Sequence, residues 1–250
     1  DYFTPVVERL RRALISRDIV HCDETPVQVL KEEGKKPQTK SYMWVYRTGN
    51  DNKAPVILYD YQPSRNGDCA ADFLKEFNGY VHSDGYSGYN KLTNITRCGC
   101  WAHLRRKFVE AIPSKKDANA PLTSAEIGRD YCDQLFHIEK GLKDLSPEER
   151  RLKRLELEKP VLDGRCALSN NAAENAIRPF TVGRKNWLFA DSTKGATASA
   201  AVYSIIETAK ANNLNVYTYL EYLLLYMPDT DWRNYPEYLD DLMPWSEAVQ

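Results

Sequence analysis

The sequence predicts an α/β fold, with a mixed five-stranded sheet covered by helices on both faces. Two observations carry this prediction. Three runs rich in β-branched and aromatic residues come first, joined by polar turns with no helical pattern between them, which favours antiparallel strands. Two further short strands then alternate with helical patterns. A sheet of mixed direction accommodates both halves.

The first half of the chain supplies the sheet. Apolar residues at helical spacing predict helices over 5–14 and 68–77. The predicted strands are 19–30, 41–48, 54–61, 79–83 and 95–100. A basic helix over 102–112 follows the last of them.

The second half is predicted to be helical. Charged helical patterns cover 124–159, with a new helix starting at Pro147, and a short alanine-rich helix then carries Glu174. Pro179 is expected to shorten that helix, because proline lacks the backbone donor. A small-residue helix over about 195–212 comes next. We divide the chain into a main domain over 1–210 and a small helical C-terminal appendage over 211–250.

Composition limits the possible partners. The 250 residues carry a net charge of −1, so any affinity for nucleic acid must come from local basic surfaces. No run of about 18 uncharged apolar residues predicts a membrane span. The start of the chain has no signal-peptide pattern and no methionine, which indicates a fragment or domain of a longer protein. Six scattered cysteines favour a reducing cytosol over a disulfide framework.

The spacing Cys98-x-Cys100-x-x-His103 is a possible zinc motif. A structural zinc site needs four ligands, usually as paired clusters, and the sequence offers no second cluster. The motif alone therefore argues against zinc.

Three acids in polar settings are the most informative residues. Asp23 lies inside an apolar strand, where a bare carboxylate is costly without a partner such as a metal; neighbouring Glu24 must face the other side of the strand. Asp84 ends another strand beside Gly85. Glu174 shares one helical stripe with Asn170 and Arg178. Carboxylates from two strands and one helix suit a pair of Mg²⁺ ions.

Each acid also has a simpler interpretation. Asp23 fits a solvent-facing edge strand, and Asp84-Gly85 fits an ordinary turn. Glu174 and Arg178 fit a surface ion pair worth about 0.3–0.5 kcal/mol. Arg178, Arg184 and Lys185, with aromatic residues interleaved, suit a nucleic-acid groove, and a solvated helix face is the alternative.

Several longer stretches resemble transposases of the insertion-sequence sixty-six family. They occur in the family's order and cover most of the chain: HCDETPVQVL, YMWVYRTG, HSDGYSGYN, CGCWAHLRRKF, DGRCALSNNAAENAIRP, VGRKNWLFA and YSIIETAKANNLNVYTYL. The resemblance implies a ribonuclease H-like catalytic domain over 1–210 whose Asp-Asp-Glu triad is Asp23, Asp84 and Glu174.

The resemblance also implies the chemistry and the partners. It implies DNA cleavage and strand transfer at mobile-element ends, dependent on two Mg²⁺ ions with Mn²⁺ as a substitute. The partners would be double-stranded DNA, further copies of the chain and accessory proteins of the element, in the bacterial cytoplasm at the nucleoid. The residues expected to support the site or contact phosphates are His103, Asn170, Arg178, Arg184 and Lys185.

Two departures from the family pattern leave alternatives open. The family's N-terminal region, thought to bind element ends, is absent, and the helical stretch before Asp163 is shorter than in the family. Such a shortening predicts, as an alternative, an inactive DNA-binding remnant. A stand-alone nuclease acting on RNA–DNA hybrids is a third hypothesis.

Overall fold

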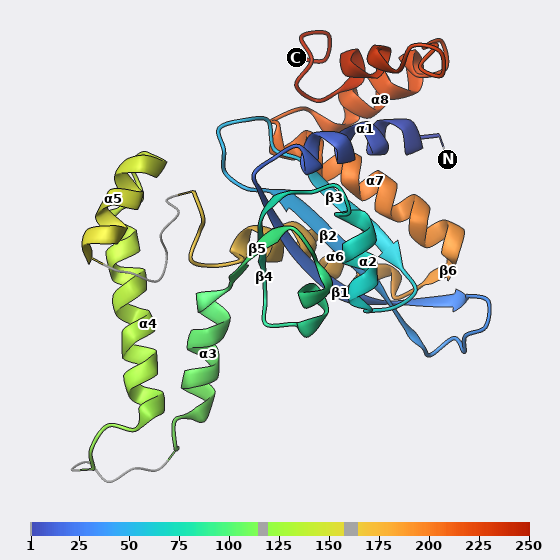
Figure 1. Cartoon of the computed structure of the whole chain (residues 1–250). Helices are drawn as coiled ribbons and strands as arrows, with labels where there is room; N and C mark the ends of the chain where they lie inside the picture. The colour runs from blue at the N-terminus through green and yellow to red at the C-terminus, as the bar shows by residue number, and fades with distance from the viewer. Residues whose placement is uncertain (1, 115–119, 158–164) are drawn as a thin grey trace.

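The computed structural model describes residues 2–114, 120–157 and 165–250, and a six-stranded mixed sheet lies at its centre (Figure 1). The strands are β1 (Ile19–Lys31), β2 (Lys40–Thr48), β3 (Ile57–Gln62), β4 (Gly79–Ser83), β5 (Ile95–Gly99) and β6 (Ala190–Ser192). Five of them run in the order β3-β2-β1-β4-β5, and β6 pairs with the far end of β1. The α/β prediction is confirmed. The count of five strands was wrong, since the three residues of β6 are too few to show a pattern.

The long strand β1 joins the two halves of the sheet. It is antiparallel to β2, and β2 to β3, as the polar turns between them predict. It is parallel to β4, and β4 to β5. The first residues of β1 therefore contact β4, while its last residues contact β6.

Helices surround this sheet and extend beyond it. In chain order they are α1 (Thr4–Ile15), α2 (Gly67–Phe73), α3 (Trp101–Ala111), α4 (Ser124–Gly141), α5 (Pro147–Leu157), α6 (Asn171–Trp187), α7 (Thr193–Ala211) and α8 (Val216–Tyr226), with short 3₁₀ turns η1 (Ser87–Lys91) and η2 (Pro236–Leu242). The charged stretch over 124–159 forms two helices, and the second begins at Pro147 as predicted. Residues 158 and 159 lie outside the described part of the chain. The predicted helix over 68–77 ends at Phe73.

Strand alternation gives the sheet two apolar faces. On one, which we call the α1 face, Trp44 and Tyr46 pack with α1 and α2. On the other, the α6 face, Met43 and Val45 pack with α6. The helices after residue 211 also bury apolar residues in the α1-face cluster.

Helix α7 covers the outer edge of β3. Thr208 Oγ1 accepts a hydrogen bond from Ile57 N at 3.0 Å and donates to Ile57 O at 2.8 Å. Ser204 Oγ accepts from Tyr59 N at 2.8 Å. These side chains replace a neighbouring strand, so the edge carries no open backbone groups at these positions.

Helix α6 continues through Pro179, contrary to the expected shortening. Ile177 and Phe180, on either side of the proline, are buried against the α6 face. Burying two large apolar side chains contributes roughly 3–6 kcal/mol, which offsets the cost of about 3 kcal/mol for an interior proline.

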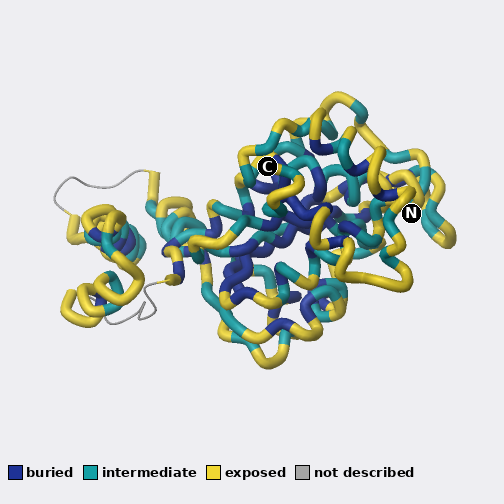
Figure 2. The backbone as a smooth tube through the Cα atoms, turned by 90° about the horizontal axis from the view of Figure 1, so that it is seen from above, coloured by how far each residue is buried: buried dark blue, intermediate teal, exposed yellow. Residues whose placement is uncertain are grey.

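Helices α3, α4 and α5 form an arm that projects away from the sheet (Figure 1). Figure 2 shows few buried residues there: α3 has none, and α4 buries Cys132 and Leu135. Arg154 of α5 donates to Glu139 of α4 at 2.6 Å inside the arm. It also donates to Cys166 O at 3.0 Å, which connects the arm to the segment before α6. No helix in the described part of the chain is long and apolar enough to cross a membrane.

Candidate active site

The two strand aspartates come from neighbouring parallel strands. Val20 pairs with Val81 and His21 with His82, so the same register sets Asp84 beside Asp23 just beyond the last paired residues. Both carboxyls are half-buried. Asp84 follows β4 directly, and its Oδ1 accepts a hydrogen bond from Tyr86 N at 2.9 Å.

Helix α6 brings the third acid to this place. Ala173, Ala176 and Ile177 bury one side of the helix on the α6 face, and Glu174 therefore faces the edge of that contact. Its charge acts on Asp23, as does that of Asp84. Glu174 Oε1 lies 3.7 Å from Nδ1 of His103 on α3, and among the described residues it makes no ion pair with Arg178. The structure thus gathers the three predicted acids.

Several negatively charged side chains surround Asp23. Burial, together with the charges of Glu24, Asp84 and Glu174, raises its pKa to about 7, although a hydrogen bond from Glu24 N opposes the shift. None of the three carboxylates has a lysine or arginine nitrogen within 4.0 Å in the described part of the chain; Arg97 donates to the backbone oxygen of Asp84 instead. A divalent cation would balance the charge of this cluster, and carboxylate oxygens are the ligands that Mg²⁺ prefers.

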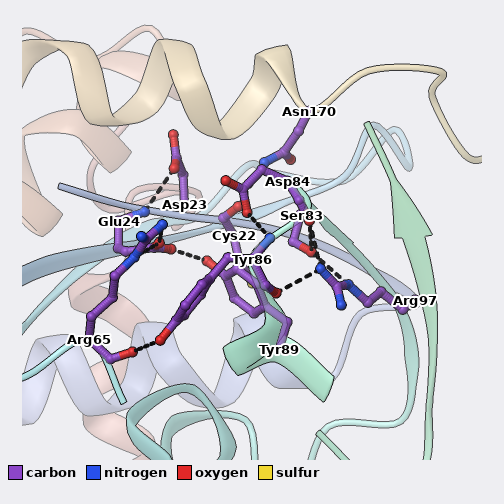
Figure 3. Close-up of polar contacts among 10 residues, drawn as sticks. All are labelled: Cys22, Asp23, Glu24, Arg65, Ser83, Asp84, Tyr86, Tyr89, Arg97 and Asn170. Atoms are coloured by element: carbon purple, nitrogen blue, oxygen red, sulfur yellow. Dashed lines mark hydrogen bonds and ion pairs between the residues drawn. The ribbon is translucent and has the colours of Figure 1, made fainter. Parts of the chain in front are cut away.

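The neighbouring Glu24 lies on the opposite, α1 face (Figure 3). Its side chain is 1 % exposed, and it accepts hydrogen bonds from Arg65 Nε at 2.7 Å and Tyr89 Oη at 2.5 Å. Strand alternation therefore separates the two acids as predicted, and Glu24 has a complete set of partners of its own.

Two rows of side chains cross the α6 face at neighbouring levels. The parallel pairing of β1, β4 and β5 puts His21, His82 and Cys98 in one row, which we call the histidine row. Two residues further along the strands, the same register puts Asp23, Asp84 and Cys100 in a second row, the acid row.

Asn170, the residue before α6, connects these rows to the helix. It is 1 % exposed. Its Nδ2 donates to Cys22 O at 2.7 Å, its Oδ1 accepts from His21 Nδ1 at 3.0 Å, and its backbone N donates to Cys100 Sγ at 3.2 Å. Burial, together with the charge of nearby His82, lowers the pKa of His21 to about 3, so this imidazole is neutral at pH 7. Of the two roles expected for Asn170, burial favours support over phosphate contact.

The possible zinc motif is divided between two groups. Cys100 and His103 lie with Glu174, whereas Cys98 lies with His82 and Cys166. Within each group the ligand atoms are all within 4.8 Å of one another. Among the described residues, the three acids do not form a third group at that separation.

The basic residues on α6 differ in exposure. Arg178 and Lys185 are exposed. Arg184 is half-buried and donates to Thr25 Oγ1 at 3.0 Å and to Pro26 O, so it attaches the end of α6 to β1.

Sequence reasoning missed three residues of this region, namely His21, His82 and Cys166. A signal for the histidines was present. Asp23 and Asp84 each follow a histidine at the same spacing, in His21-Cys22-Asp23 and His82-Ser83-Asp84. Equal spacing on parallel strands in register puts both histidines in one row. Cys166 had no such signal, because only the tertiary fold brings it to β5.

The chain matches two family models. The model described as Transposase IS66 family matches residues 1–164 and 161–198, and the IS66 C-terminal element matches residues 204–245. The first match consists of two segments that meet at 161–164.

Curated relatives come from Sinorhizobium fredii. The uncharacterized protein y4hP is 26 % identical over 300 residues, covering 96 % of this chain and 53 % of that protein. The uncharacterized protein y4qI is 28 % identical over 290 residues, covering 96 % of this chain and 52 % of that protein. The chain thus spans about half the length of these relatives. No solved structure matches it.

Proposed function

The chain belongs to the IS66 transposase family, and from this premise we propose that it is the catalytic region of a DNA transposase. Its reaction is phosphodiester cleavage at the ends of a mobile element, followed by strand transfer into target DNA. Asp23, Asp84 and Glu174 are the proposed catalytic residues and the ligands of two Mg²⁺ ions.

One observation carries this proposal. Three acids, from β1, the end of β4 and α6, lie close enough for the charges of Asp84 and Glu174 to act on Asp23, and no carboxylate of the three forms an ion pair with lysine or arginine among the described residues. Burial, together with the charges of Glu24, Asp84 and Glu174, raises the pKa of Asp23 to about 7. This disfavours the ionised form unless a cation joins the cluster. The donor set is all oxygen, which fits Mg²⁺ and Mn²⁺ better than softer metals.

When bound, a pair of Mg²⁺ ions supplies an activated nucleophile and stabilises the leaving oxygen of an in-line displacement. The chain's own residues prepare the place for this chemistry. Asp23 and Asp84 are fixed by adjacent parallel strands, so their separation depends on the sheet. Asn170 holds the start of α6 to β1, and Glu174 therefore depends on Asn170 for its position. His103 lies beside Glu174 and orients that carboxylate.

The proposed partner is double-stranded DNA, both element ends and target, bound by several copies of the chain with accessory proteins of the element. Exposed Arg178 and Lys185 on α6 are suited to phosphates near the acids. Arg184 serves α6 itself, through its bond to Thr25.

A strand-transfer assay on duplex DNA carrying the element's ends tests the proposal. The unaltered chain should give products with Mg²⁺ or Mn²⁺, and Asp84→Asn should lower the rate by about 10³-fold, since it removes an anionic ligand from the site. Asp60→Asn is the matched control, because Asp60 lies on β3, outside the acid cluster. Equal activity of the unaltered chain and Asp84→Asn would refute the role of Asp84.

An inactive remnant is the second candidate, and the comparisons give a reason for it. The alignment to y4hP spans 300 positions against 250 residues in this chain, at least 50 more. The break in the family match falls at 161–164, in the stretch that is shorter than in the family. The direct packing of α6 on β1 and β2 supports the active candidate, because Glu174 keeps its position without further helices.

The same samples separate these candidates. The chain is a remnant with an intact metal site if it has no activity but its melting temperature still rises with Mg²⁺. The melting temperature of Asp84→Asn should then not rise with Mg²⁺. Cleavage of RNA–DNA hybrids in place of strand transfer would identify a hybrid nuclease instead.

A further inference from the structure

We propose that His82, Cys98 and Cys166 bind one Zn²⁺ ion, at a site separate from the acid cluster. The three residues come from β4, β5 and the segment that leads into α6. Imidazole and thiolate are the ligands that zinc prefers, whereas Mg²⁺ requires oxygen.

The geometry fits zinc without rearrangement of the sheet. His82 and Cys98 are direct partners in the parallel pairing of β4 and β5, so their side chains lie on the same face. The two sulfur atoms of Cys98 and Cys166 are 3.8 Å apart. Two thiolates, each about 2.3 Å from a tetrahedral zinc ion, are expected about 3.8 Å apart. A disulfide would require about 2.05 Å.

His82 gives an independent reason to expect a ligand. It is 1 % exposed, and neither of its ring nitrogens has a hydrogen-bond partner among the described residues. Its ring stacks on His21 at 4.5 Å, an interaction that leaves both nitrogens unsatisfied. A buried imidazole without partners destabilises the fold, and coordination by a metal ion removes that cost.

The second group, Cys100 with His103 and Glu174, is a weaker zinc site. It offers one sulfur, and that sulfur already accepts a hydrogen bond from Asn170 N at 3.2 Å. Its carboxylate belongs to the acid cluster. The group around His82 has two sulfurs and shares no residue with that cluster.

The site would tie the start of α6 to the sheet. Cys166 lies four residues before Asn170 in the sequence. Leu168 lies between these two residues, and its backbone oxygen accepts a hydrogen bond from Trp101 N at 2.9 Å. An ion joining Cys166 to β4 and β5 would hold this segment against the strands that carry Asp84. The fourth zinc position would be taken by water, which reaches the partly exposed Cys98.

Metal binding by the purified, reduced full chain tests the proposal directly. After loading with Zn²⁺ and dialysis, one zinc per chain should remain in excess Mg²⁺. Loading with Co²⁺ should give thiolate-to-metal charge-transfer absorption. Cys98→Ser, Cys166→Ser and His82→Gln should each lower zinc affinity at least tenfold, while Cys132→Ser, in α4, should not. Asp84→Asn should keep its zinc, so the result is independent of the proposed transposase activity.

Alkylation mapped by mass spectrometry on the unaltered chain guards against variants that fail to fold. Zinc should slow alkylation of Cys98 and Cys166 and leave Cys69 unchanged. The proposal would be overturned if zinc protected Cys100 instead, or if the unaltered chain retained no zinc. It would also be overturned if both cysteine variants retained zinc, or if Cys98 and Cys166 formed a disulfide in the reduced preparation.

Discussion

The two faces of the sheet treat adjacent acids of β1 in opposite ways. On the α1 face, Glu24 is buried and bonded to Arg65 and Tyr89. On the α6 face, Asp23 faces Asp84 and Glu174 and has no basic residue within 4.0 Å in the described part of the chain. Glu24 and Asp23 are adjacent in the sequence, yet the nearest charge to Glu24 is the positive Arg65, whereas the charges acting on Asp23 are those of other acids.

This difference distinguishes Glu24, an acid that stabilises the fold, from the three acids of the candidate active site. Glu24 with its partners joins β1 to the segment before α2 and to η1. The acid cluster opposes folding in the absence of a cation, because burial and the neighbouring charges of Glu24, Asp84 and Glu174 raise the pKa of Asp23. Destabilising arrangements of this kind are found mainly at functional sites.

The largest expected effect is on stability. Glu24→Gln should lower the free energy of unfolding by about 2–3 kcal/mol, since Arg65 and Tyr89 lose their charged hydrogen-bond acceptor, a carboxylate that is 1 % exposed. Asp23→Asn should leave stability unchanged or raise it at pH 8 without divalent ions. Urea denaturation of both variants measures the difference. Equal destabilisation by the two changes would show that the faces do not differ as described.

A third buried acid sharpens this comparison. Asp60 on β3 has no cation partner in a direct ion pair among the described residues, and burial raises its pKa to about 6 from an ordinary value of 3.8. The folded state therefore holds its proton more tightly than the unfolded state. Stability from this group is complete below about pH 4 and is lost as the pH rises to about 6.

Asp60→Asn should therefore raise the free energy of unfolding at pH 7 by about 1–2 kcal/mol, a value reduced because solvent reaches part of the carboxyl. It should have no effect at pH 4. Denaturation curves at the two pH values measure it. The response to Mg²⁺ should be unchanged, because Asp60 lies outside the acid cluster; a lost response would contradict that separation.

The sequence predicted five of the six strands of this sheet, and the face of β1 on which Asp23 and Glu24 each lie, for a physical reason. Alternating apolar residues report directly which face of a strand is buried, so the strand pattern alone assigns Asp23 and Glu24 to opposite faces. The position of Glu174 followed from helical periodicity and the alanines around it.

The sequence did not predict what tertiary packing alone determines. The length of α6 was underestimated, because burial of Ile177 and Phe180 offsets the effect of Pro179. The division of Cys98 from Cys100 was missed as well. Cys98 and Cys100 are two positions apart, so they face the same way, but the strand rise of about 3.3 Å per residue puts them in different rows. Cys98 lies with His82, and Cys100 lies with Glu174.

The smallest expected effect concerns the exposed cations of helix α6, Arg178 and Lys185. Arg178→Ala should weaken binding to duplex DNA about three- to fivefold and reduce the slope of log K against log salt by about 0.9, the value for one phosphate contact. Fluorescence anisotropy at several salt concentrations measures both. Lys153→Ala is the matched control, because Lys153 lies on α5 and pairs with Glu156. If both changes reduced the slope equally, binding would follow net charge, and the α6 face would have no special part in holding DNA near the acids.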